Sequence, residues 1–330
     1  MDVARLASVS PATVSRFLNH PSMVGDETRR TIANAIEMLG FVRNRRASSL
    51  SGTRSGVIGA LVPTIGNAIF AEAIGTFEQV LKESGYGLLL ASSLYDLQRE
   101  HSQFVTLVEQ GVDALMLVGN EHTPETYRLL DRLQLPFVQI WSFSGTSYRP
   151  EIGFDNALAA HDITEHLLQL GHQRFALITG ITKDNDRATS RLAGTVDALL
   201  ERGIVIPECE IVQCEYEISS AYECVLQFLN QSRPIPTALI CGNDVIAHGA
   251  LSACRNAGLS IPGDISIVGF GDFSFSAFLS PPLTTIRIPA KRIAQRAAEA
   301  LTKSIEDHSP IKSSKIPYEL KIRGTSGPAP

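Results

Sequence analysis

The chain has 330 residues, of which 44% are hydrophobic, and a formal net charge of −5 at pH 7. This length exceeds one ordinary domain, and the hydrophobic share is normal for a globular protein that buries sizeable cores. No apolar segment follows a basic start and no run approaches ~18 uninterrupted apolar residues, so the sequence predicts neither a signal peptide nor a membrane span. The five cysteines lack CxxC spacing and fit reduced thiols in a cytoplasmic protein.

The charge is unevenly distributed along the chain. Residues 1–56 hold eight arginines, no lysine and four acids, a formal charge of +4, so the rest of the chain carries −9 of the total of −5. A basic part on an acidic body is expected where one part meets phosphate and the rest must not. The asymmetry therefore favours a nucleic-acid contact within the first 56 residues.

Three short helices are predicted at the start of the chain, over Asp2–Ala7, within Val9–Asn19 and over Asp26–Leu39. In the third, Ile32, Ile36 and Leu39 share one stripe. Three short helices with the second one exposed follow the helix-turn-helix plan. The alternative for the second helix alone is a surface helix that is merely polar on its outer side.

The second helix carries the start signals of a capped helix. Ser10 is a suitable N-cap, and Pro11 suits the first helical position, where its missing N–H costs nothing. Val9 and Val14 stand where a hydrophobic staple would hold the entry of the chain. The outward face contains no acid and presents Ala12, Ser15, Arg16 and Asn19. These types suit a DNA major groove, because Arg can donate twice to guanine, Asn can read adenine and Ala can touch a thymine methyl.

The opening residues resemble a known family. The matching segments are Asp2-Val3-Ala4, residues 9–16, Leu18-Asn19, Gly40-Phe41, Asn44-Arg45, Ala47 and Leu50. They are similar to the opening signature of the lactose/galactose repressor family of transcriptional regulators. The resemblance implies DNA contacts by Ser10, Pro11, Ala12, Thr13, Ser15, Arg16, Asn19, Asn44, Arg45, Ala47 and Leu50.

The segment after the head, residues 44–52, is predicted to be a hinge. It is too short to hold a helix unaided, and Ala47 and Leu50 are its only apolar residues. It can be a linker in the free protein and a helix on DNA beside a partner copy. The resemblance implies a hinge helix whose Leu50 wedges into the minor groove. We therefore expect a DNA-binding head over 1–43 and a hinge and linker over 44–56.

From residue 57 the pattern alternates between strand and helix. Strands are predicted at Val57–Val62, Gly87–Ala91, Ala114–Val118 and Phe137–Ile140, then at Arg174–Thr179, Ile211–Cys214, Ala238–Cys241 and Ser266–Gly269. Helices are predicted near Ile69–Ser84, Gln98–Gln110, Pro124–Leu133, Asn156–Leu170, Thr189–Arg202, Ser219–Gln231 and Val245–Ala257. Such alternation predicts parallel sheets covered on both faces. The fold class is thus α/β, with two doubly wound lobes, similar to periplasmic binding proteins, after an all-α helix-turn-helix head.

The end of the chain is expected to cross back between the lobes, as the resemblance implies. The core would span 57–330, with an N-lobe of about 57–152 plus 284–310 and a C-lobe of about 153–283 plus 311–325. The tail from Gly324 to Pro330 is expected to be frayed. It carries no leucine heptads, so we expect a homodimer without a tetramer-forming coil.

Signatures of catalysis are weak. No GxSxG elbow and no Walker loop occur in the sequence. Gly269-Phe270-Gly271-Asp272 begins like a dinucleotide fingerprint, but its sixth position is Ser274. His161, His166 and His172 do not share a helical face, so a zinc site is not expected. Gly171-His172 is interpreted as a helix C-cap. We expect no metal, no cofactor and no enzyme activity.

Polar and aromatic residues at strand ends or helix starts predict an effector site between the lobes. The predicted set is Asn67, Phe70, Trp141, Asn185, Arg187, Arg191, Tyr216, Asn243 and Asp272. For each residue alone, a cap, an ion pair or a core ring is the alternative. The resemblance supports Phe70, Arg191, Tyr216 and Asn243. Relatives usually carry a ligand-binding acid where Gly271 stands; either Asp272 replaces it by a one-residue shift, or the effector does not need that acid.

We therefore interpret the chain as a dimeric, allosteric, DNA-binding transcriptional regulator that binds operator DNA as a repressor. A sugar or sugar acid in the cleft is the expected effector, and Arg187 with Arg191 favours a carboxylated one such as gluconate. One alternative is a sugar-binding protein without DNA function, because periplasmic binders share the two-lobed core. Another is an enzyme on a doubly wound fold.

Overall fold

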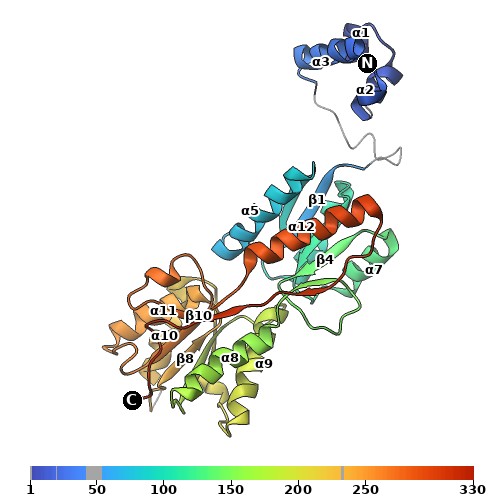
Figure 1. The fold of residues 1–330 in the computed structure, drawn as a ribbon. Helices are drawn as coiled ribbons and strands as arrows, with labels where there is room; N and C mark the ends of the chain where they lie inside the picture. The colour runs from blue at the N-terminus through green and yellow to red at the C-terminus, as the bar shows by residue number, and fades with distance from the viewer. Residues whose placement is uncertain (1, 20, 42–53, 232–233) are drawn as a thin grey trace. The chain divides into compact units, whose positions relative to one another are not determined.

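The computed structural model describes residues 2–19, 21–41, 54–231 and 234–330 (Figure 1). It divides into two compact units, Met1–Ser55 and Gly56–Pro330. Among the residues described, no helix is long and apolar enough to span a membrane.

The first unit has the predicted helices. They are α1 (Asp2–Leu6), α2 (Pro11–Asn19) and α3 (Asp26–Leu39), with a short 3-10 turn, η1, at Pro21–Met23. Their buried core consists of Val3, Ala4, Ala7, Val14, Ile32 and Ala35. One expectation for the stripe of α3 was wrong, because Leu39 is 45% exposed. Ala35, one turn earlier, packs in the core beside Ile32.

The second unit contains two six-stranded sheets. The first has the order β11-β5-β4-β3-β1-β2 and consists of β1 (Val57–Val62), β2 (Gly87–Ser92), β3 (Ala114–Val118), β4 (Phe137–Ile140), β5 (Glu151–Gly153) and β11 (Ser314–Lys315). The second has the order β12-β10-β9-β8-β6-β7 and consists of β6 (Phe175–Gly180), β7 (Ile211–Cys214), β8 (Ala238–Cys241), β9 (Ser266–Gly271), β10 (Thr284–Arg287) and β12 (Glu319–Lys321). All pairs are parallel except β10 with β12. We call these two halves the N-lobe and the C-lobe.

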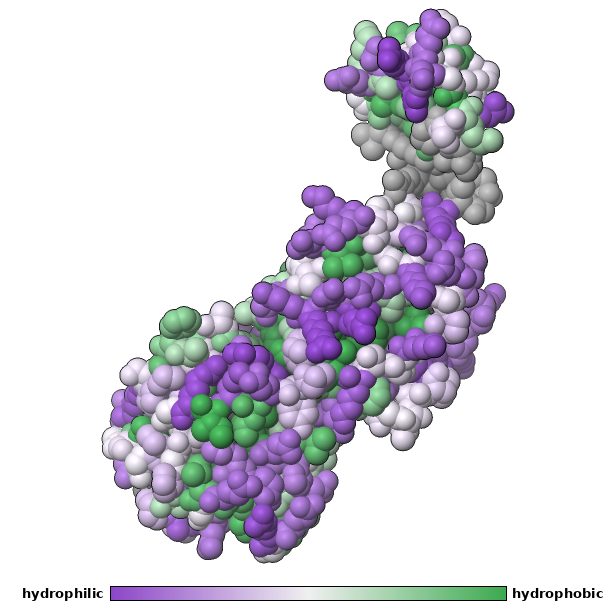
Figure 2. Space-filling model, viewed as in Figure 1, coloured by the Kyte–Doolittle hydropathy of each residue, from purple (hydrophilic) through white to green (hydrophobic). Residues whose placement is uncertain are grey.

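Helices cover the two sheets. They are α5 (Ala68–Glu83), α6 (Leu97–Glu109), α7 (Pro124–Leu133), α8 (Asn156–Gln169), α9 (Asp186–Glu201), α10 (Ile218–Gln231), α11 (Asp244–Asn256) and α12 (Ala290–Asp307), with 3-10 turns η2 (Glu208–Glu210) and η3 (Ser276–Phe278). Although α12 follows a C-lobe strand in the chain, it packs beside α5 on the N-lobe (Figure 1). The inner strands β3 and β6 are buried along their whole length, which explains their continuous apolar sequences. Hydrophilic residues cover most of the face in Figure 2.

The chain crosses between the lobes three times, and the predicted boundaries need correction. The crossings lie between β5 and α8, between β10 and α12, and between β11 and β12. Residues 284–287 therefore belong to the C-lobe, because β10 pairs with β9 and β12. Residues 314–315 belong to the N-lobe, because β11 pairs with β5. Strands of two to four residues carry too little pattern to reveal their partner sheet.

The tail does not fray. Thr325 is fully buried, and Ala329 N donates to Leu170 O at 2.9 Å. Gly327 N donates to the hydroxyl of Ser266 at 3.1 Å. Main-chain hydrogen bonds, rather than a run of apolar side chains, hold this tail in place. Its polar, glycine-rich sequence therefore did not indicate that it is ordered.

Candidate functional site

The outward face of α2 has the predicted character. Thr13 N donates to Ser10 Oγ at 3.1 Å, which confirms the N-cap. Ser10, Pro11, Ala12, Ser15 and Arg16 are all exposed, and Thr13 is half-buried. Val14 is buried in the core against which Val9 packs. The helix has no acid in its first turn and a basic Arg16 in its last. This exposed face can approach phosphate and base edges without like-charge repulsion.

Several predicted DNA contacts cannot be compared with the structure. Asn44, Arg45, Ala47 and Leu50 lie outside the described residues, as does the side chain of Asn19. Their roles stay predictions.

A cavity between the lobes contains eight of the nine predicted effector residues. Its lining includes Asn67, Phe70, Trp141, Asn185, Arg187, Arg191, Tyr216 and Asn243. Its free space is about 40 Å³. A larger chamber of about 540 Å³ adjoins it and shares Asn67 and Tyr216. The set converges because the carboxyl ends of parallel strands in both lobes face one another.

Arg191 is the most unusual residue of this cavity. Its Nη1 donates to Asn156 Oδ1 at 3.1 Å, and its Nη2 donates to Tyr216 Oη at 3.4 Å. Its guanidinium carbon lies 4.9 Å from the centre of the Phe270 ring. Its Nε is buried without a hydrogen-bond partner in the described residues. Burial lowers the pKa of Arg191, yet arginine stays charged because its ordinary pKa is about 12.5–13.8.

Arg187 differs from Arg191 because its charge is already paired. Its Nη1 lies 2.6 Å from Asp186 Oδ1 and donates to Val118 O at 3.2 Å. Only 6% of Arg187 is exposed. Arg187 lines the cavity, but its Nη1 is occupied by protein acceptors.

The three asparagines have different partners. Asn185 Oδ1 accepts from Ala188 N, and Asn243 Oδ1 accepts from Ile246 N, so both cap helices while lining the cavity. Capping, which was the alternative for Asn243, is therefore correct for both residues. Asn67 makes no cap bond, and its Oδ1 is buried without a partner among the described residues. It offers a free acceptor to a ligand.

Aromatic rings line the cavity from both lobes. The Phe70 and Trp141 ring centres lie 5.1 Å apart, and those of Tyr95 and Tyr216 lie 5.4 Å apart. Burial raises the pKa of the Tyr95 hydroxyl, which keeps it neutral. Sequence reasoning missed Tyr95, although it follows β2 just as Tyr216 follows β7. It also missed the apolar lining residues Ile69, Phe270, Phe273 and Ile288.

The structure does not bring Asp272 to this cavity. Its carboxylate lies 2.6 Å from Arg287 Nε and 2.6 Å from Arg323 Nη2, and it is absent from the lining. Gly271 has a φ of +137°, and a Cβ there would lie 2.3 Å from the Phe273 ring. Phe273 therefore occupies the space beside Gly271, and the expected one-residue shift of an acid does not occur.

A buried carboxylate that the prediction did not include positions the Phe273 turn. Asp244 accepts from Phe273 N at 2.8 Å, from Ser276 Oγ at 2.5 Å and from Thr285 Oγ1 at 2.5 Å. Burial raises the pKa of Asp244 to about 6. Because Thr285 lies on β10, Asp244 ties the cavity wall to a strand beside a crossing.

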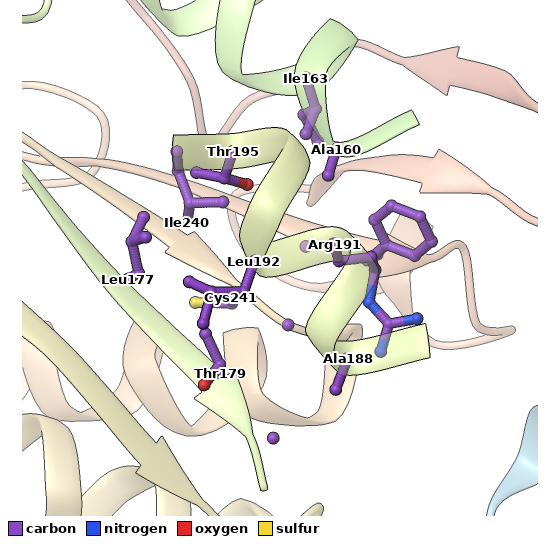
Figure 3. Close-up of a pocket in the computed structure, with 14 residues that line it drawn as sticks. Ala160, Ile163, Leu177, Thr179, Ala188, Arg191, Leu192, Thr195, Ile240 and Cys241 are labelled. Atoms are coloured by element: carbon purple, nitrogen blue, oxygen red, sulfur yellow. The ribbon is translucent and has the colours of Figure 1, made fainter. Parts of the chain in front are cut away.

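A second, mainly apolar chamber lies inside the C-lobe (Figure 3). Ala160 and Ile163 from α8 and Leu192 from α9 face the sheet across about 20 Å³ of free space. Arg191 lines both chambers.

Histidines and cysteines form no metal centre in the described residues. Gly171 has a φ of +89°, and His172 N donates to Leu167 O, so the predicted C-cap is confirmed. His172 is buried between the hydroxyls of Thr237 and Ser266. Of the thiols, Cys214, Cys241 and Cys254 are buried, Cys224 is half-buried and Cys209 is exposed.

Comparisons with known proteins agree with both units. Residues 1–44 match the family model of bacterial regulatory proteins, lacI family, and residues 164–326 match a periplasmic binding protein-like domain. The HTH-type transcriptional repressor PurR of Glaesserella parasuis serovar 5 is 30% identical over 316 residues, covering 96% of this chain and 92% of its own. The HTH-type transcriptional regulator GntR of Escherichia coli K12 is 32% identical over 311 residues, covering 93% and 92%.

A solved structure shares the whole fold. The lac repressor dimer bound to operator and the anti-inducer ONPF has a TM-score of 0.84 and 26% identity, covering 99% of this chain and 98% of that one. The match of residues 1–44 disfavours a sugar-binding protein without DNA function. The chain therefore belongs to the lacI family of bacterial regulatory proteins and is a DNA-binding transcriptional regulator with a helix-turn-helix head and an effector-binding core.

Proposed function

We propose that this regulator is a repressor whose effector is a sugar acid held by Arg191. The observation that carries the proposal is the lack of a carboxylate partner for Arg191 among the described residues, although its Nε is buried. A buried charge without a counter-ion is costly, and a bound carboxylate would supply both the opposite charge and the missing acceptor.

The other cations and acids near the cavity do not change this balance. Arg187 is paired with Asp186, and Asp272 is paired with Arg287 and Arg323. Phe273 fills the space beside Gly271, so that position supplies no acid, while Glu215 and Glu217 line the adjoining chamber. One positive charge, that of Arg191, thus stays uncompensated in the lining, which favours an anion over a neutral sugar.

The remaining lining suits a hydroxylated carbon skeleton. Asn67 Oδ1 is a buried acceptor without a partner among the described residues, and it would accept from a ligand hydroxyl. Phe70 and Trp141 present rings on which a C–H face can pack. Gluconate, which combines a carboxylate with hydroxyl groups, is the example we favour.

The DNA-binding part of the proposal uses two copies of the chain. Because the related lac repressor is a dimer on its operator, we propose that this chain also acts as a homodimer and reads two half-sites in the cytoplasm, without a catalytic role. Ser10, Ala12, Thr13 and Arg16 would contact DNA from α2, and Leu50 would kink the centre of the operator. An effector-dependent lobe movement would change operator affinity by roughly 5- to 150-fold.

Titration calorimetry with gluconate and with glucose tests the effector class. We expect gluconate to bind and Arg191→Met to weaken it about 10- to 150-fold, since a charged hydrogen bond is lost. The control Arg292→Met removes an exposed arginine of α12 and should leave the affinity unchanged. Equal affinity for glucose and gluconate would contradict the anionic class.

Fluorescence anisotropy with DNA from upstream of the gene tests the operator function. We expect specific binding that weakens steeply as the salt concentration rises, because phosphate contacts release counterions. Binding that gluconate leaves unchanged would contradict the proposed coupling.

A further inference from the structure

The effector cavity is continuous with a larger chamber. The cavity has about 40 Å³ of free space and the chamber about 540 Å³, and both are lined by Asn67, Tyr95, Tyr216 and Phe273. Since a water molecule needs on the order of 10–15 Å³, the cavity accommodates about three such molecules, which is the space of a carboxylate group. A sugar acid whose carboxylate lies at Arg191 therefore places its carbon chain in the larger space, which we call the outer chamber.

The outer chamber carries the opposite charge to the cavity. Glu215 and Glu217 line it, and no lysine, arginine or histidine does so among the residues that the structure describes. Both glutamates are exposed, and Glu217 N donates to Glu215 O at 2.8 Å, so a tight turn holds them on either side of Tyr216. His248, whose ring centre lies 5.6 Å from that of Phe275, stays neutral at pH 7, because burial lowers its pKa. The chamber is therefore negatively charged.

Tyr216 marks the boundary between the two charges. Its Oη accepts from Arg191 Nη2 at 3.4 Å, and its ring centre lies 5.4 Å from that of Tyr95. Its neighbours in the chain are the two glutamates of the outer chamber. A ligand that passes Tyr216 thus meets a positive charge at one end and negative charges at the other. This separation complements a ligand with an anionic end and a cationic end.

Aromatic rings line the outer chamber beside the acids. Tyr95, Tyr216 and Phe273 lie between the cavity and the chamber, and Phe275 lines the chamber alone. The ring centres of Phe273 and Phe275 lie 5.8 Å apart, and the rings are inclined at 77°. The face of an aromatic ring attracts an ammonium group. Rings and carboxylates together therefore favour a cation over the hydroxyl group of a neutral sugar, which gains no charge attraction from either.

We propose that the outer chamber is an ammonium subsite and that the effector is a sugar acid with a protonated amine at the end of its chain opposite the carboxylate. Glu215 and Glu217 pair with the ammonium, and the rings of Tyr95 and Phe275 lie beside it. This inference rests on the proposed function for the carboxylate at Arg191, and it adds the chemistry of the other end. A primary amine has a pKa near that of lysine, about 10.4, and is therefore charged at pH 7.

Calorimetry of the full-length protein at pH 7 with three ligands of equal chain length tests the subsite. They are gluconate, its derivative in which an amine replaces the terminal hydroxyl, and glucarate, which has a second carboxylate there. We expect the amine to bind roughly 3- to 30-fold more tightly than gluconate, because it adds an ion pair and contacts with aromatic faces. Glucarate should bind more weakly than gluconate, because its second carboxylate meets two acids.

Neutral variants identify the groups responsible. Glu215→Gln combined with Glu217→Gln keeps the size of both side chains and should abolish the preference for the amine. Both positions are exposed, so the free energy of unfolding should change little. The matched control, Glu208→Gln, removes an exposed acid of η2 that lines neither space and should keep the preference. Phe275→Leu, which keeps apolar bulk without a ring, should lower the preference in part.

Two ligands without a carboxylate separate this inference from the proposed function. Glucamine differs from glucitol only in an amine that replaces one terminal hydroxyl. We expect glucamine to bind more tightly, and the double glutamine variant to remove the difference. If no sugar acid binds while glucamine still exceeds glucitol, the proposed effector class fails and the ammonium subsite stands.

Three results overturn the ammonium subsite. They are equal affinity for gluconate and its amine, equal affinity for glucamine and glucitol, or a preference for the amine that persists in the double glutamine variant. An equal loss of affinity for gluconate and its amine in that variant also overturns it, because the two acids would then bind hydroxyl groups.

Discussion

The face of α2 and the cavity between the lobes differ in the exposure of their side chains and in how those side chains are paired within the protein. In the head, Ala12, Ser15 and Arg16 are exposed on one helix that Ser10 starts. In the cavity, side chains are tied to other protein groups, as Arg191 is to Asn156 and Tyr216. Water can solvate the polar groups of an exposed face, whereas a buried site pairs most of its polar groups within the protein and leaves few, such as Arg191 Nε and Asn67 Oδ1, for a ligand.

This difference separates residues that can be substituted with little loss of stability from residues that also support the fold. A residue on the face of α2 can be replaced with little loss of folding stability, because water solvates what remains. A residue of the cavity wall often also caps a helix or holds a loop. Variants of the two regions should therefore divide into changes of binding alone and changes of binding with stability.

The largest effect is expected at Asp244. Asp244→Ala leaves Phe273 N and the hydroxyls of Ser276 and Thr285 without their acceptor inside the C-lobe. The free energy of unfolding should fall by ~3–5 kcal/mol, because each unsatisfied buried donor costs ~1–3 kcal/mol. Urea unfolding followed by circular dichroism measures this loss. The control Asp197→Ala, on the exposed side of α9, should change it by less than about 0.5 kcal/mol.

Arg16→Ala should have the opposite profile. It should weaken operator binding by ~1–3 kcal/mol, mainly at one base pair, while the unfolding free energy stays unchanged. Anisotropy titrations against operator variants and against random DNA separate the contributions. An equal loss on every DNA sequence would identify Arg16 as a phosphate contact. The control is Arg30→Ala, which removes an arginine on the exposed side of α3.

The fold was largely predictable from the sequence because its signals are local. The alternation of strand-like and helical runs predicted β1, β3, β4, β7 and β8 with the bounds observed, and it predicted the starts of α7 and α8. Short strands such as β5 and β11 were missed or misplaced, because two or three residues carry no period. The prediction that the tail from Gly324 frays was wrong for a related reason. Main-chain hydrogen bonds hold the tail, and they leave no pattern in the sequence.

The cavity was predictable only as far as strand ends indicate position. That rule placed Arg191 and Tyr216 correctly, and it could have found Tyr95. It could not show that Asp272 pairs with Arg287 and Arg323, because Arg323 lies 51 residues away in sequence. Such pairing depends on tertiary structure, which periodicity does not encode.

A smaller effect is expected in the pH dependence of the unfolding free energy, which tests the role of Asp244 in the cavity wall. The folded-state pKa of Asp244, about 6, exceeds its ordinary value of about 3.9, so the folded protein binds a proton more readily than the unfolded chain. Stability contributed by this group is therefore present at pH 4 and is lost as the pH rises through 6. Relative to Asp244→Asn, the wild-type unfolding free energy should decrease by ~1–2 kcal/mol between these values, as measured in urea. A parallel pH dependence of both proteins would assign the slope to other groups.

The smallest effect is expected at the start of α2, where Ser10 combines features of both regions. Ser10 is exposed like the DNA-facing residues, but its Oγ accepts from Thr13 N as a wall residue would. Ser10→Ala should therefore lower the opening free energy of the α2 amides by ~1 kcal/mol, measured by hydrogen exchange. Ser10→Gly should cost only a few tenths, because glycine leaves the first amides open to water. Equal exchange in all three proteins would mean that the cap contributes nothing. Ser10 would then act only toward DNA, and a loss of operator affinity in both variants would measure that contact.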